Sequence, residues 1–212
     1  MRLFKQAKKH LKVALGTLPS PVQHQNGRPF IFVHINKTGG TSVGNAIGLP
    51  VKSHQTARGI IKRLGRDEWD KSFKFTFVRN PWDRIVSLYK YRLKKNRTRI
   101  ASHQLDFDQW IEKTIGSQQS RYYYDNPKSF QPQVDWLKDN EGKISIDFIG
   151  RFEQLESDFK VVRKELGLQS DLPHLNATSR TPYQTYFSER SFDTVSDWFK
   201  EDILTFDYQF DG

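Results

Sequence analysis

The sequence predicts one α/β domain with a central parallel sheet flanked by helices. Three short apolar runs have the length and composition of strands buried on both faces: FIFVHI at 30–35, FKFTFVRN at 73–80 and ISIDFIG at 144–150. Helical patterns follow these runs along the chain, and strands that alternate with helices form parallel sheets. The length of 212 residues suits one such domain.

The helices are predicted from the spacing of apolar residues and from residues that start or end helices. A short helix should run from about Thr41 to Ile47, and the next should begin at Asn80 and Pro81, because proline favours the first helical position. Gly167 should end a later helix. The apolar positions of the last predicted helix are Phe192, Val195, Phe199 and Ile203.

The composition is that of a soluble globular protein with a basic surface. Hydrophobic residues make up 36% of the chain, and 16 Phe, 8 Tyr and 5 Trp can fill a core without disulfides. There is no cysteine, which excludes thiol catalysis and Cys-ligated zinc. The net charge of +10 indicates a polyanionic partner, such as a nucleic acid, an acidic membrane, an anionic glycan or a multiply phosphorylated cofactor.

We expect residues 1–29 to form a basic N-terminal helix with a connector, and residues 30–212 to form the globular domain. The first residues, MRLFKQAKKHLKVALG, contain no acidic side chain, and their longest apolar run is too short for a signal peptide or a membrane span. We therefore expect a cytoplasmic protein whose N-terminal helix makes at most weak contact with a membrane surface. The connector at 17–29 is rich in Pro, Gly and Asn.

Two predicted strands end in polar loops, and the carboxyl ends of parallel strands meet at the edge where such sheets bind ligands. In the first loop, the glycines allow backbone N–H groups to turn toward an anion, the hydroxyls add donors at a helix N-terminus, and the lysine adds a mobile cation. This lysine precedes the glycines, whereas it follows them in the common nucleotide-binding loop. The candidate anion-binding residues are Lys37, Thr38, Gly39, Gly40, Thr41 and Ser42.

The second loop lies in FVRNPWDRIVS, directly after the strand at 73–80. Arg79 stands at the strand end, where its planar guanidinium can bind a phosphate with two hydrogen bonds. Ser87 lies two helical turns further along, so its hydroxyl can reach the same group. Arg84 and Arg92 should be surface charges, with Asp83 paired to one of them.

These two loops, together with IGRFEQLESDF and LPHLNATSR, resemble the sulfotransferases, in particular the carbohydrate, heparan-sulfate-type branch. The resemblance spans roughly residues 30 to 210 and implies the P-loop-like sulfotransferase fold. It also implies transfer of the sulfuryl group from 3′-phosphoadenosine 5′-phosphosulfate (PAPS) to an acceptor hydroxyl. The branch that it resembles implies a carbohydrate acceptor, and an anionic glycan is one candidate. In this family the first loop holds the 5′-phosphosulfate, and the residues corresponding to Arg79 and Ser87 hold the 3′-phosphate.

The mechanism that this resemblance implies needs no metal. A sulfuryl group carries less negative charge than a phosphoryl group, so Lys37 can suffice to neutralise charge that develops on the leaving phosphate oxygen. The resemblance also implies a catalytic His or Glu after the first loop, and we predict His54 as the general base. A helix-capping role for His54 is the alternative, with Glu68 and Asp70 as the other candidate bases. His34 should be a buried, hydrogen-bonded strand residue.

The late segment LNATSRTPY, at 175–183, corresponds to the family loop that closes over the cofactor. Ser179 and Arg180 are the predicted cofactor contacts there. Arg151 is expected to form a structural ion pair with Glu153.

Two other functions compete with this one. A P-loop kinase or NTPase needs a Mg²⁺-binding acid, but Asp147 is followed by more apolar strand rather than by a loop. A non-enzymatic protein that binds nucleic acid or another polyanion would use the net charge and the aromatic residues, but it would not need two cofactor-like loops. We therefore expect no nucleic-acid partner.

Overall fold

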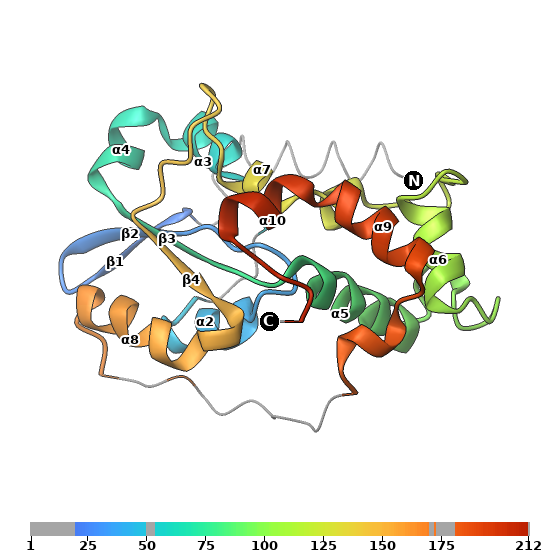
Figure 1. The fold of residues 1–212 in the computed structure, drawn as a ribbon. Helices are drawn as coiled ribbons and strands as arrows, with labels where there is room; N and C mark the ends of the chain where they lie inside the picture. The colour runs from blue at the N-terminus through green and yellow to red at the C-terminus, as the bar shows by residue number, and fades with distance from the viewer. Residues whose placement is uncertain (1–19, 50–53, 170–171, 173–180, 212) are drawn as a thin grey trace.

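The computed structural model describes residues 20–49, 54–169, 172 and 181–211. Its sheet has four strands in the order β1-β2-β3-β4: Val22–Gln25, Arg28–Phe32, Phe73–Val78 and Phe148–Arg151. Strands β2, β3 and β4 are parallel, and β1 is antiparallel to β2. The predicted α/β fold with a central sheet between helices is confirmed, with a mixed sheet in place of a purely parallel one (Figure 1).

The antiparallel strand lies in the segment that we expected to be a connector. Asn26 and Gly27 join β1 to β2 with φ angles of 50° and 78°, the left-handed values that a two-residue hairpin turn requires. Pairing with Ile31 places Val22 in the core with 8% of its surface exposed. The basic N-terminal helix lies outside the described residues, so the division of the chain between residues 29 and 30 stays a prediction.

One face of the sheet is covered by helix α2 (Gly40–Ala46) and helix α8 (Leu155–Leu166) (Figure 1). Side chains alternate between the two faces of a strand, so every second residue of β2 and β3 contacts these helices. The core on this face contains Phe30, Phe32, Phe75 and Phe77 from the strands, Val43 and Ile47 from α2 and its end, and Phe159, Val162 and Leu166 from α8.

The other face carries the larger core, to which Ile31, Val33, Ile35 and Val78 contribute. Trp69, Trp110 and Trp136 are buried in it. The helices that supply its side chains are α3 (Ala57–Leu64), α4 (Arg66–Lys71), α5 (Pro81–Lys94), α6 (Phe107–Thr114), α7 (Gln133–Leu137), α9 (Glu189–Trp198) and α10 (Lys200–Phe206). Short 3₁₀ turns lie at Arg97–Arg99, Pro127–Ser129, Phe152–Gln154 and Tyr183–Tyr186.

The predicted helix ends form as the local chemistry requires. The Asn80 side chain accepts hydrogen bonds from the N–H groups of Trp82 and Asp83 at the start of α5, and Gly167 ends α8 at a φ of 63°. The last predicted helix is two helices in the structure, because the chain bends at Phe199 between α9 and α10. Among the described helices, none combines the length and apolar composition that a membrane span needs.

Candidate active site

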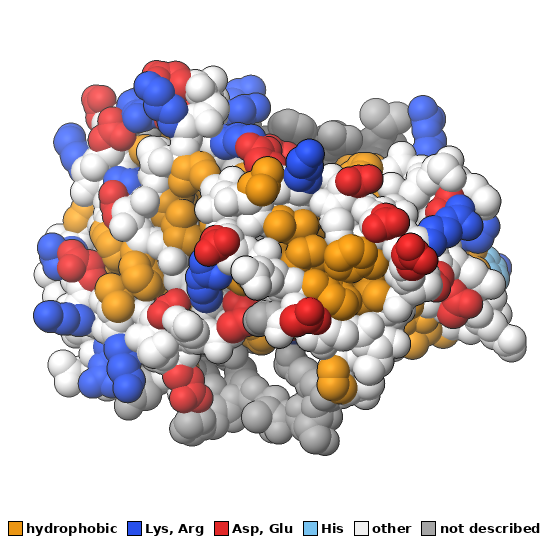
Figure 2. All heavy atoms as spheres, in the orientation of Figure 1, with side chains coloured by type: hydrophobic (Ala, Val, Ile, Leu, Met, Phe, Trp, Pro, Cys, Tyr) orange, Lys and Arg blue, Asp and Glu red, His pale blue; other side chains and the backbone are white. Residues whose placement is uncertain are grey.

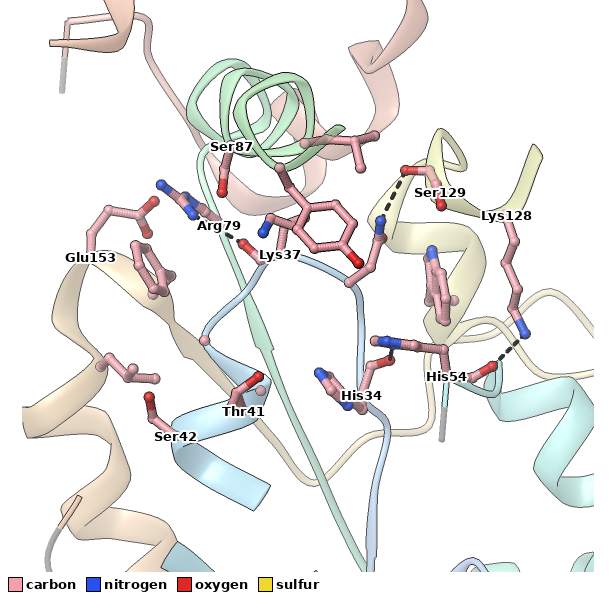
Figure 3. Close-up of a pocket in the computed structure, with 18 of the residues that line it drawn as sticks. His34, Lys37, Thr41, Ser42, His54, Arg79, Ser87, Lys128, Ser129 and Glu153 are labelled. Carbon is pink, nitrogen blue, oxygen red and sulfur yellow. Dashed lines mark hydrogen bonds between the residues drawn. The ribbon is translucent and has the colours of Figure 1, made fainter. Parts of the chain in front are cut away.

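The loops that follow the three parallel strands line one cavity of about 1690 Å³ at the carboxyl edge of the sheet (Figure 3). Residues 34–42 follow β2, Arg79 follows β3, and residues 152–157 follow β4. The predicted site residues on the cavity wall are Lys37, Gly39, Gly40, Thr41, Ser42, His54, Arg79 and Ser87. The rule that such sheets bind ligands at the carboxyl ends of their parallel strands, called the carboxyl-edge rule below, therefore located the cavity correctly.

One predicted cofactor contact among the described residues, Thr38, is not on this wall. Thr38 is fully buried, and its hydroxyl donates a hydrogen bond to the Ile35 carbonyl, so it shapes the first loop from inside. Ser179 and Arg180 lie outside the described residues.

The first loop curls because Lys37 and Gly39 both adopt the left-handed conformation, with φ angles of 68° and 80°. Helix α2 begins at Gly40, and the N–H groups of Ser42 and Val43 donate to the Gly39 carbonyl at 2.9 and 3.3 Å. The N–H groups of Gly40 and Thr41, which precede them, have no partner within the helix. A β-carbon on Gly40 would lie 1.9 Å from Nε2 of His34, and one on Gly39 would lie 2.9 Å from Leu155. Both positions therefore require glycine for close approach.

Lys37 and Arg79 connect the two predicted loops. The Lys37 ammonium lies 4.8 Å from the centre of the Tyr91 ring on α5. Its carbonyl accepts a hydrogen bond from Nη1 of Arg79 at 3.1 Å. The backbone of the first loop is thus tied to the end of β3.

The guanidinium of Arg79 is held from several sides. Its Nε and Nη2 donate to Oδ2 of Asp83 at 2.8 and 2.6 Å, and its carbon lies 4.1 Å from the centre of the Phe152 ring. The side chain is only 4% exposed. Our expectation that Asp83 would pair with Arg84 or Arg92 is wrong, because Asp83 pairs with Arg79 one helical turn away.

Arg84 and Arg92 are also not surface charges, since both are buried. Arg84 donates to the Asn36 side chain at 3.0 Å and to the Gln131 carbonyl at 2.8 Å, and its burial lowers its pKa to about 10. Arg92 pairs with Asp125 at 2.6 Å on the cavity wall. The helical spacing alone did not reveal that polar loops would cover this face of α5.

His54 reaches the cavity from the segment before α3. Its Nδ1 lies 3.0 Å from the carbonyl oxygen of His34, and its carbonyl accepts a hydrogen bond from the Lys128 ammonium at 2.7 Å. A carbonyl oxygen can only accept, so this contact places the hydrogen on Nδ1 and the lone pair on Nε2. Imidazole in this tautomer can accept a proton through Nε2.

The two alternative bases lie elsewhere. Glu68 and Asp70 are on α4, which ends directly before β3 and therefore lies at the opposite edge of the sheet. Asp70 binds Arg66 at 3.0 Å, and neither carboxylate is among the residues that line the cavity. Of the predicted bases, the structure brings only His54 to the cavity.

Two further acidic residues have structural partners. Asp147 accepts from the Lys74 N–H at 2.7 Å and pairs with the Lys74 ammonium at 3.0 Å, at the start of β3 and away from the cavity. Glu153 accepts from the Asn80 N–H at 2.7 Å and from the Tyr208 hydroxyl at 3.1 Å. The expected ion pair between Arg151 and Glu153 is therefore replaced by these contacts.

Within the described part of the chain, no group of three or more His, Asp or Glu side chains is arranged to hold a metal ion.

The sequence model of the sulfotransferase family matches residues 25–209. The chain belongs to the sulfotransferase family. Its predicted family is confirmed, and the match begins within strand β1.

Two proteins are similar in sequence to this sulfotransferase. One is an uncharacterized protein of Archaeoglobus fulgidus, 34% identical over 115 residues, which cover 53% of this chain and 82% of that protein. The other is carbohydrate sulfotransferase 10 of Danio rerio, 26% identical over 203 residues, which cover 76% of this chain. This match covers 52% of the Danio rerio protein, so the chain spans about half of that relative's length. No solved structure gives a significant match.

Sequence reasoning missed several residues of the cavity wall in the sulfotransferase. Phe152 follows β4, so the carboxyl-edge rule could have predicted it. Tyr91, Lys128 and Trp136 had no such signal, because their positions depend on how α5 and the segment 125–137 pack against the sheet. These three residues provide two aromatic rings and an ammonium on the wall that also holds His54.

Proposed function

We propose that this sulfotransferase transfers the sulfuryl group of PAPS to a hydroxyl of a carbohydrate acceptor, in line and without a metal ion. The observation that carries the proposal is that Lys37, His54, and Arg79 with Ser87 come from three separate segments and line one cavity (Figure 3). An anion-binding loop alone occurs in many enzymes. Its combination with a second basic site and a histidine suits a donor with two anionic ends and an acceptor that must lose a proton.

The wall of the cavity fits the anionic groups of PAPS. The backbone of the first loop approaches neighbouring side chains closely at Gly39 and Gly40, where β-carbons would collide with them. Helix α2 begins at Gly40 and directs its first N–H groups out of the helix end. In Figure 3, Arg79 and Ser87 lie together on the side of Lys37 that is away from His54. We assign the 5′-phosphosulfate to the first loop and the 3′-phosphate to Arg79 and Ser87.

When bound, PAPS supplies an activated sulfuryl group on a phosphate that can leave. Lys37 provides the positive charge for the oxygen of that leaving phosphate, because its ammonium is on the same loop as the anion-binding N–H groups. His54 accepts the proton of the acceptor hydroxyl on Nε2, since Nδ1 is committed to the His34 carbonyl at 3.0 Å. Arg79 holds the Lys37 carbonyl at 3.1 Å and so fixes the base of the lysine side chain.

The carbohydrate acceptor is proposed from the Danio rerio relative and from the wall around His54. Asn126, Lys128 and Ser129 bring polar groups to the cavity, and the Lys128 ammonium lies 5.0 Å from the centre of the Trp136 ring. Polar groups that converge beside an aromatic ring suit a sugar, because hydroxyls need hydrogen-bond partners and the ring packs against C–H groups. An acceptor screen with labelled PAPS tests this part of the proposal directly.

Thermal unfolding with three ligands in parallel tests the donor site. The ligands are 3′-phosphoadenosine 5′-phosphate, ATP with Mg²⁺, and single-stranded DNA. We expect only the first to stabilise the protein selectively, by about 2.7 kcal/mol at a concentration of 100 times its Kd. Selective stabilisation by ATP with Mg²⁺ would favour a phosphotransferase instead.

Stabilisation by DNA would favour the non-enzymatic polyanion-binding function. On the face in Figure 2, Lys and Arg side chains are interspersed with Asp and Glu and do not form one continuous patch. The exposed surface on this face therefore adds nothing to that alternative.

A further inference from the structure

His34 occupies a position where the sequence pattern calls for an apolar side chain. Phe30 and Phe32 point to the face of the sheet that α2 covers, and residue 34 continues this alternation beyond the end of β2. Val33 and Ile35 point to the opposite face and are fully buried there. The imidazole of His34 stacks on the Phe32 ring with centroids 5.2 Å apart and is part of the cavity wall.

The ring of His34 supports the first loop. A β-carbon on Gly40 would lie 1.9 Å from Nε2 and 2.0 Å from Cδ2 of His34, so the imidazole fills the space that a side chain at residue 40 would occupy. His34 is 7% exposed, which leaves little room for its ring to move. The position of the start of α2 therefore depends on this ring.

The same residue also holds His54, through both its backbone and its ring. The His34 carbonyl lies 3.0 Å from Nδ1 of His54, and the two ring centroids are 4.2 Å apart at an angle of 43°. In Figure 3, the two imidazoles lie side by side below Lys37. The other ring near His54 is Trp136, whose centroid is 6.3 Å away.

We propose that His34 is a positioning residue that sets the distance and orientation of His54 relative to the first loop. This inference rests on the proposed function, since it assigns His34 a role in presenting the general base to the acceptor. His34 acts through its shape: its ring is a flat spacer between Gly40 and His54. An apolar aliphatic side chain would fill the volume but would not present a flat face to both neighbours.

A double-mutant cycle between His34→Ala and His54→Ala tests the proposal in the enzyme with a responsive acceptor. We expect His34→Ala to lower kcat by about 10- to 100-fold, the scale of a small misplacement of a catalytic group. In the His54→Ala background, the same substitution should lower kcat by clearly less than in the wild-type background, because the group that it positions is absent and only its support of the first loop remains. Losses that multiply in the double variant would overturn the proposal.

Val162→Ala is the matched control. Val162 on α8 is fully buried in the core that contains Phe32, the ring on which His34 stacks, and it does not line the cavity. Its effect on kcat should be the same in both backgrounds. His34→Gln is the second variant should the alanine variant not fold, since it retains most of the volume but not the flat ring.

Nuclear magnetic resonance of the imidazole nitrogens tests the contact without any acceptor. The His54 signals, assigned by their loss in His54→Ala, should show hydrogen on Nδ1 in the wild-type protein and a mixture of tautomers in His34→Ala. Unchanged His54 signals in a folded His34→Ala variant would overturn the positioning role. A wild-type protein that sulfates none of the acceptors would contradict the proposed function instead, and the imidazole signals would still decide the role of His34.

Discussion

Replacing Arg79 by alanine should weaken binding of 3′-phosphoadenosine 5′-phosphate by about 2 kcal/mol, which corresponds to about 30-fold in Kd. A phosphate held by the whole guanidinium fork would be expected to lose 2–5 kcal/mol on truncation. In the structure, the edge formed by Nε and Nη2 already binds Asp83 at 2.8 and 2.6 Å. Because less of the guanidinium is then left for a phosphate, we expect a loss of binding free energy near the lower limit of this range. Part of the loss should come from the Lys37 carbonyl, which loses its contact with Nη1.

Titration calorimetry with the folded variants measures this loss. Arg79→Lys should recover only part of the affinity, because an ammonium cannot reach Asp83, the Lys37 carbonyl and a ligand together. Asp83→Asn is the matched control: it keeps the shape of the partner and removes a negative charge that opposes the phosphate, so affinity should stay equal or rise. An Arg79→Ala protein with wild-type affinity for the nucleotide would refute the assignment of Arg79 to the 3′-phosphate.

Four other predictions follow from the site. His54→Ala should lower kcat by about 10²–10⁴ and remove the acidic limb of the pH–rate profile, with nucleotide affinity nearly unchanged in calorimetry; a surviving limb would mean that another group is the base. Lys37→Ala should lower kcat strongly and also weaken nucleotide binding, since its ammonium meets the bound anion before and during transfer. Gly40→Ala should cost about 1–3 kcal/mol of stability in denaturant unfolding and reduce nucleotide binding, because its β-carbon would collide with the His34 ring; a variant as stable as wild type would show that the ring moves easily. Activity should persist in EDTA, and a loss that Mg²⁺ restores would favour phosphoryl transfer.

The sequence by itself determined the elements around the site and where the site lies. Apolar runs predicted the three parallel strands, although the third begins at Phe148 and not at Ile144, and Asn80 and Gly167 marked helix ends that the structure confirms. The polar loops after the first two strands, around Lys37 and Arg79, were enough to predict a shared cavity, because parallel strands all end at one edge of a sheet. These are local features, so they can be read from short stretches of sequence.

Only the tertiary structure decided which partners the charged side chains have. Arg84 is buried because Asn36 and Gln131, which accept its hydrogen bonds, lie 48 and 47 residues away in sequence and cover this face of α5. His54 faces the cavity because the His34 carbonyl and the Lys128 ammonium hold it there, 20 and 74 residues away in sequence. Such contacts depend on packing between segments that are distant in the chain, and residue type and spacing carry no record of them.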